Sequence, residues 1–115
     1  NIDAYTGGNA GHWILDGQKA GGGVVASFGI HRLDLVRHLG GCDFEEVTAR
    51  GRFDPPFTGG AESQASVLFR MSNGATGTLH ANARAPRTGY YDSFTLHGTH
   101  GSIMEVGGPL RHATA

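Results

Sequence analysis

The chain has 115 residues, the length of one domain, and its formal net charge of −1 comes from scattered acidic and basic residues. Without a basic stripe, nucleic acid and anionic membrane surfaces are not expected partners. Because no apolar run approaches the roughly 20 residues of a membrane-spanning helix, and the single Cys42 excludes an internal disulfide, we expect a soluble, cytoplasmic protein.

The sequence begins Asn-Ile-Asp rather than with methionine. We therefore expect residues 1–115 to be a single domain cut from a longer protein. The first 20 residues show weak periodicity, and they predict no long element.

A helix is predicted over residues 22–39. Apolar residues recur there at spacings of three, four and seven, namely Val25, Phe28, Leu35, Val36 and Leu39. The following pair Gly40-Gly41 is typical of the left-handed stop at a helix end.

After Cys42 the apolar period changes to about two, which predicts strands over residues 47–53, 64–71, 75–85, 91–97 and 102–106. The run Ser72-Asn73-Gly74 indicates a hairpin between the second and third of these strands. One long helix followed by such strands predicts an α+β fold: a largely antiparallel open sheet with the helix packed on one face.

The glycines before the helix match a known spacing. Gly21, Gly23 and Ala26 satisfy the dinucleotide fingerprint G-x-G-x-x-A, in which backbone amides bind a pyrophosphate. That fingerprint needs a hydrophobic strand immediately before it, whereas residues 16–20 are Asp-Gly-Gln-Lys-Ala. We expect these glycines to form a helix entry and to bind no cofactor.

Three polar residues share one face of the predicted helix. Ser27, His31 and Asp34 are spaced by four and three positions, so their side chains can meet. A buried imidazole needs hydrogen-bond partners, which Ser27 or Asp34 could supply. The spacing alone leaves two alternatives, a satisfied core histidine or a site that handles protons.

Longer motifs point to a family. The run GGGVVASFGIHRLDLVRHLGG at residues 21–41 closely resembles a helix of the Gfo/Idh/MocA oxidoreductases, whose pattern is roughly GGG-hhh-D-h-G-h-H-hh-D-hhhhh-G, with h apolar. Residues 68–79 resemble the family's strand, Asn-Gly turn and strand, and residues 96–103 resemble its terminal hairpin. The chain is thereby similar to the carboxyl-terminal domain of these enzymes.

This resemblance implies an amino-terminal Rossmann domain outside the 115 residues that binds NAD or NADP. It implies that His31 is the catalytic residue, exchanging a proton with a substrate hydroxyl or carbonyl while hydride moves to or from the cofactor. Asp34 matches a family aspartate that contacts or positions substrate. The family's sheet commonly builds a dimer, which implies a homo-oligomer.

Position 27 departs from the family pattern, because Ser27 stands where the family has aspartate. A carboxylate one turn from an imidazole favours the imidazolium and sets its tautomer, whereas a hydroxyl does only the second. We expect Ser27 to contact substrate and to position a proton.

Other candidates rest on residue type. Trp13 either stacks on a sugar or nicotinamide ring or packs in the core, and Tyr90 either lines a polar substrate pocket or lies on a loop edge. His97 and His100 have a spacing compatible with a metal site, but no cysteine or carboxylate cluster joins them. No metal is expected.

The resemblance implies an NAD(P)-dependent dehydrogenase or reductase of a sugar, cyclitol or similar polyhydroxylated molecule. Two alternatives stay open: an NAD-dependent glycoside hydrolase of the same family, and a non-catalytic cofactor-binding regulator or dimerisation scaffold. The 115 residues alone are expected to be inactive, since the cofactor is bound mainly by the other domain.

Overall fold

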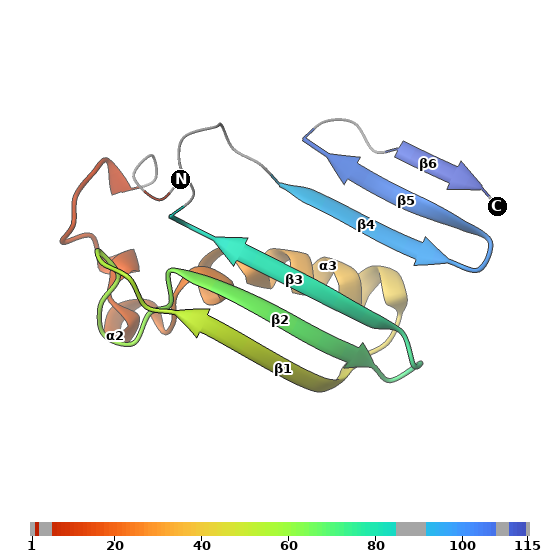
Figure 1. Cartoon of the computed structure of the whole chain (residues 1–115), viewed down its shortest axis with the longest axis horizontal. Helices are drawn as coiled ribbons and strands as arrows, with labels where there is room; N and C mark the ends of the chain where they lie inside the picture. Colours follow the sequence, from red (N-terminus) through yellow and green to blue (C-terminus); the bar gives the residue numbers. More distant parts are fainter. Residues whose placement is uncertain (1, 3–5, 85–91, 108–110, 115) are drawn as a thin grey trace. The chain divides into compact units, whose positions relative to one another are not determined.

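The computed structural model describes residues 2, 6–84 and 92–107, and the backbone of 111–114. The chain folds as two compact units, residues 1–85 and residues 86–115. Each unit contains a three-stranded sheet, and Figure 1 labels the elements.

After residue 6 the first unit has two short helical segments, the 3₁₀ turn η1 (Trp13–Leu15) and the helix α2 (Gly17–Ala20). The long helix follows, as predicted. Its first part is a π-helical segment, η2 (Val25–Gly29), which runs directly into α3 (Ile30–Gly40). The predicted stop is also confirmed, because Gly41 adopts a left-handed conformation with φ of 60°.

The sheet of the first unit has the order β1-β2-β3, with β1 (Phe44–Arg52), β2 (Gln64–Met71) and β3 (Thr76–Asn82) antiparallel. The predicted Asn-Gly hairpin joins β2 and β3, and the Ala75 amide donates to Asn73 Oδ1 at 3.0 Å. β1 begins three residues earlier than predicted. A register irregularity between Phe44 and Glu46 interrupts the alternation there while pairing with β2 continues.

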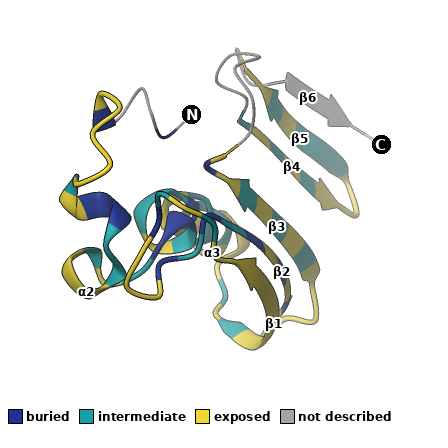
Figure 2. Cartoon of the chain, turned by 60° about the vertical axis from the view of Figure 1, so that its left-hand side comes forward, coloured by how far each residue is buried: buried dark blue, intermediate teal, exposed yellow. Residues whose placement is uncertain are grey.

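One face of this sheet is covered by α3. Alternate residues of β2 are buried, and Leu33 and Val36 of α3 pack on the cluster formed by Val67, Phe69 and Met71. The expected packing of the helix on one sheet face is therefore confirmed. The opposite face is open, and Figure 2 shows β1 exposed along nearly its whole length.

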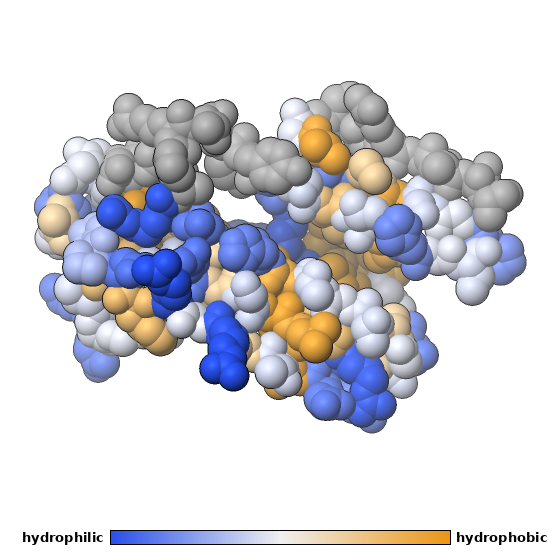
Figure 3. Space-filling view, in the orientation of Figure 1, coloured by the Kyte–Doolittle hydropathy of each residue, from blue (hydrophilic) through white to orange (hydrophobic). Residues whose placement is uncertain are grey.

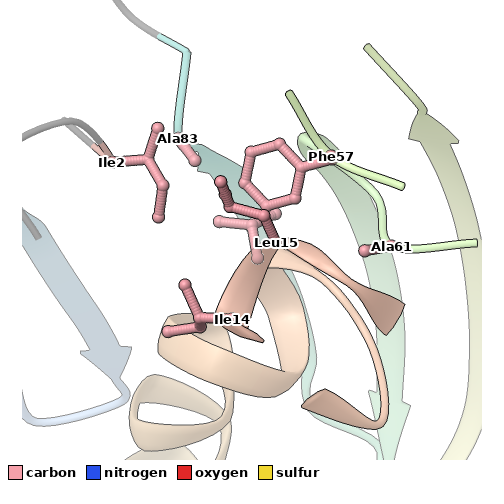
Figure 4. Close-up of a cluster of buried hydrophobic side chains, with 7 residues drawn as sticks. Ile2, Ile14, Leu15, Phe57, Ala61 and Ala83 are labelled. Carbon is pink, nitrogen blue, oxygen red and sulfur yellow. The ribbon is translucent and has the colours of Figure 1, made fainter. Parts of the chain in front are cut away.

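A second apolar cluster lies beside the start of the long helix. Its buried members come from η1, the helix start and two loops: Ile2, Ile14, Leu15, Val24, Phe57, Ala61 and Ala83. Figure 4 shows Leu15 and Phe57 side by side at its centre. Trp13 is not a member, since it is 55% exposed. The interpretation of Trp13 as a core residue is wrong, because the turn of η1 directs the two following side chains inward instead.

The second unit is a sheet of order β4-β5-β6, with β4 (Ser93–Gly98), β5 (Gly101–Val106) and β6 (Arg111–Thr114) antiparallel. The predicted hairpin between β4 and β5 is confirmed. β6 was not predicted, because the residues Arg-His-Ala-Thr show no apolar alternation. Its strand conformation follows from backbone pairing with β5, which a side-chain pattern does not reveal.

Candidate functional site

The glycine run positions the start of the helix that carries His31. Gly21 is left-handed, with φ of 80°, and ends α2. Gly23 is buried against Glu62, and a Cβ atom at Gly23 would overlap the backbone nitrogen and carbonyl oxygen of Glu62. The sequence needs glycine at this position because two backbone segments meet there.

Glu62 occupies the free amides at this helix start. Its Oε2 accepts from the Gly23 amide and its Oε1 from the Val25 amide, both at 2.9 Å. Its backbone carbonyl accepts from the Val24 amide, also at 2.9 Å. A carboxylate at this end also suits the helix dipole. These bonds agree with the predicted helix entry and leave no room for a phosphate cradle at these three amides.

The same glycines also lack the context of a dinucleotide fingerprint, because α2 rather than a strand precedes them. Sequence reasoning missed Glu62, since 39 positions separate it from Gly23. No local pattern indicates a capping residue at such a distance. The only signal in the sequence is a single glutamate just before a predicted strand, which does not show what it binds.

Ser27, His31 and Asp34 lie on the side of the helix that faces away from the sheet. A Cβ atom at Gly29 would lie 3.1 Å from Leu79 Cδ2 of β3, so Gly29 marks the side that faces the sheet. His31 follows two residues later, about 200° around the helix axis. Its side chain is exposed, as is that of Asp34, whereas Ser27 is half-buried. The interpretation of His31 as a satisfied core histidine is therefore wrong.

The π segment ends at Gly29, two residues before His31. The Ile30 amide donates to the Val25 carbonyl, five residues back, and such wide turns occur frequently at functional sites. Within the described residues, no hydrogen bond joins the side chains of Ser27, His31 and Asp34 to one another. The arrangement offers an imidazole, a hydroxyl and a carboxylate on one helix face.

The other predicted residues have different surroundings. The ring of Trp13 lies 5.8 Å from that of His12, tilted by 31°, and its exposure leaves it able to stack on a ligand. Tyr90 lies outside the described residues.

The two histidines of the β4–β5 hairpin bond to neighbouring hydroxyls. His97 Nδ1 lies 2.8 Å from Ser102 Oγ, and His100 Nδ1 lies 3.0 Å from Thr99 Oγ1. In the part of the chain that the structure describes, no three histidine, cysteine or acidic residues gather as a metal site would require. None of the described helices has the length and apolar composition needed to cross a membrane.

Comparison with known proteins identifies the family of the chain. The family model described as the GFO/IDH/MocA C-terminal domain matches residues 2–104. Levoglucosan dehydrogenase of Pseudarthrobacter phenanthrenivorans is 26% identical in an alignment 114 residues long, and the alignment covers 80% of this chain and 29% of that enzyme.

Solved structures are also similar to this chain. Levoglucosan dehydrogenase in complex with NADH, and with NADH and L-sorbose, is 28% and 27% identical to the chain. Each comparison covers 83% of this chain and 27% of the other, with a TM-score of 0.74. GenD2 from gentamicin A biosynthesis, in complex with NAD, is 29% identical over 82% of this chain and 27% of its own, with a TM-score of 0.72.

The chain thus spans less than a third of the length of these relatives. The family match extends over residues 2–104, most of the sequence. These 115 residues belong to the Gfo/Idh/MocA family of oxidoreductases and correspond to its carboxyl-terminal domain.

Proposed function

We propose that this chain is the substrate-facing domain of an NAD(P)-dependent dehydrogenase or reductase of a sugar or similar polyhydroxylated molecule. The observation that carries the proposal is the exposed His31, held on the helix face turned away from the sheet. Relatives in this family include a dehydrogenase solved with NADH and L-sorbose. A cytoplasmic location stays a prediction.

The chemistry assigned to this chain is proton transfer. In the oxidising direction, the O–H bond of a substrate hydroxyl breaks, and its proton goes to a ring nitrogen of His31 while the carbon loses hydride and a carbonyl forms. NAD(P), when bound, takes or gives that hydride. In the reducing direction His31 returns the proton to the new hydroxyl.

The residues of this chain fit the reacting end of the cofactor better than its phosphates. The helix start with the fingerprint spacing already holds the Glu62 carboxylate, so pyrophosphate would meet a negative charge there. Ser27 and Asp34 are assigned to substrate hydroxyls, since both lie on the His31 face. Trp13 is assigned to stacking on a ring face.

The proposal is tested with the full-length protein and a panel of sugars and cyclitols that includes levoglucosan and L-sorbose. We expect substrate-dependent formation or consumption of NADH or NADPH, followed by absorbance, with substrate-free mixtures as the control. If no member of the panel changes the absorbance, the proposal fails. NAD-dependent release of a chromogenic aglycone would instead support a glycoside hydrolase, and cofactor binding without turnover would support a regulator or scaffold.

We also propose that two copies associate through the open face of the first sheet. Leu68 lies in the middle of this face, is 56% exposed, and pairs in register with Thr48 and Thr78. Charged residues flank it, since Arg70 forms an ion pair with Glu46 at 3.0 Å. Figure 3 shows the apolar surface between polar residues over these strands. A single exposed leucine is ordinary on a protein surface, so the proposal is drawn mainly from the family resemblance, in which this sheet commonly builds a dimer.

Leu68→Asp should convert an oligomer of the full-length protein to monomer, because a charge would have to be desolvated in the centre of the interface. Size-exclusion chromatography with light scattering measures the mass. Leu39→Asp is the matched control, since Leu39 is similarly exposed, at 47%, but lies on α3. An unchanged mass for Leu68→Asp would refute association through this face.

A further inference from the structure

Glu62 holds the start of the helix through both of its carboxylate oxygens. Each oxygen accepts one amide at 2.9 Å, from Gly23 and from Val25. With the Glu62 backbone carbonyl on Val24, three successive amides of the helix start are bound to one residue of the loop before β2. Glu62 is half-buried, so water competes with these bonds less than at an exposed cap.

The two amides held by the carboxylate belong to residues that bond onward to the candidate site. The Gly23 carbonyl accepts the Ser27 amide at 3.0 Å. The Val25 carbonyl accepts the amide of Ile30, the residue before His31. Glu62 Oε2 is therefore linked through Gly23 to the backbone of Ser27. Glu62 Oε1 is linked through Val25 to the backbone of Ile30, next to His31.

The π segment makes the direction of the His31 side chain sensitive to how the helix start is held. A π turn is rare and less regular than an α-helical turn, so a helix start without a cap can rearrange to α-helical spacing. Adding or removing one residue from a turn rotates every later side chain about the axis by roughly 100°. Glu62 binds the amides of both Gly23 and Val25, and it thereby restrains this rotation.

We propose that Glu62 is a positioning residue for His31 and Ser27, acting through the backbone of the helix start. This inference rests on the proposed function, because it concerns the geometry in which His31 exchanges its proton. Misplacement of a reacting group by about 1 Å can cost about a hundredfold in rate.

The test uses Glu62→Gln and Glu62→Ala in the full-length protein. Glutamine keeps the shape but retains one acceptor oxygen, and alanine retains none. We expect kcat to fall by about ten- to a hundredfold for Glu62→Gln and further for Glu62→Ala, while KM for NAD(P) stays within about twofold of the wild type. Hydrogen exchange of peptides spanning residues 24–31 should become at least about tenfold faster in both variants.

Asp16→Asn is the matched control, because Asp16 Oδ1 caps α2 through the Gln18 amide at 3.0 Å. It removes a capping carboxylate from the same unit without touching the long helix. The asparagine amide oxygen can still accept from the Gln18 amide, so we expect kcat and the exchange of residues 24–31 to stay unchanged in Asp16→Asn. Equal losses of kcat in Asp16→Asn and Glu62→Gln would overturn the positioning role.

The exchange measurement separates this inference from the proposed function. If the wild-type protein turns over no sugar but Glu62→Gln still exchanges faster at residues 24–31, the function is wrong and the restraint by Glu62 stands. If the wild type is active, and kcat and exchange are both unchanged in Glu62→Gln, the inference is wrong and the function stands.

Discussion

His31→Ala in the full-length protein is expected to lower kcat by about 100- to 10,000-fold, the usual contribution of a positioned acid or base. KM for NAD(P) should stay within a few-fold of the wild type, because Glu62 already binds the amides of Gly23, Val24 and Val25 at this helix start. Thermal stability should also be unchanged, since the His31 side chain is exposed. Steady-state kinetics with varied cofactor and substrate, and a thermal melt, measure these quantities.

His38→Ala provides the control for this variant. His38 lies two turns after His31 on the same helix and is also exposed, but it is remote from the π segment and from Ser27. Its kcat is expected to remain within about twofold of the wild type. A parallel loss of kcat and cofactor affinity in His31→Ala would contradict proton transfer, and would instead indicate that His31 binds the cofactor.

Gly23→Ala is expected to lower the free energy of unfolding by about 3 kcal/mol, at the upper end of overpacking effects. The added methyl group would overlap the backbone of Glu62, as well as its carboxylate. Neither backbone segment can move alone, because the Val24 amide and the Glu62 carbonyl are bonded to each other. Denaturant unfolding of the full-length protein measures the loss.

Gly40→Ala is the matched control, because Gly40 lies at the end of α3 and a Cβ atom there would meet only the Cys42 sulfur, at 3.3 Å. Alanine is favoured over glycine inside helices by roughly 0.5–1 kcal/mol, so stability should change by no more than about 1 kcal/mol. Similar losses in the two variants would show that glycine is required generally in this helix, and not at the contact with Glu62.

Local signals in the sequence predicted most of the elements. The helix, its end at Gly41 and both hairpins follow from apolar spacing and turn residues, which act over a few positions. The strand β6 and the early start of β1 were missed, because backbone pairing rather than side-chain alternation determines them. The division of the strands into two sheets also depends on pairing between distant residues.

The candidate site was only partly predictable, and His31 illustrates why. Its spacing from Ser27 and Asp34 is a property of the sequence, but both a core histidine and an exposed one satisfy that spacing. The close approach of Gly29 to Leu79 decides which helix face meets the sheet. The exposure of Trp13 could not be predicted from the sequence either. The indole is excluded from the core because Ile14 and Leu15, which follow it, are buried there instead.

The glycine run shows most clearly which features follow from the sequence and which follow only from the tertiary structure. By itself the sequence determined the family resemblance, the helix and the presence of His31 on it, because these depend on residue types at short spacings. Only the tertiary structure decided what Gly21 and Gly23 are for. Gly21 ends α2, and Gly23 lets the helix start approach Glu62, which is brought there by a loop. Contacts between residues so far apart leave no periodic trace in a single sequence.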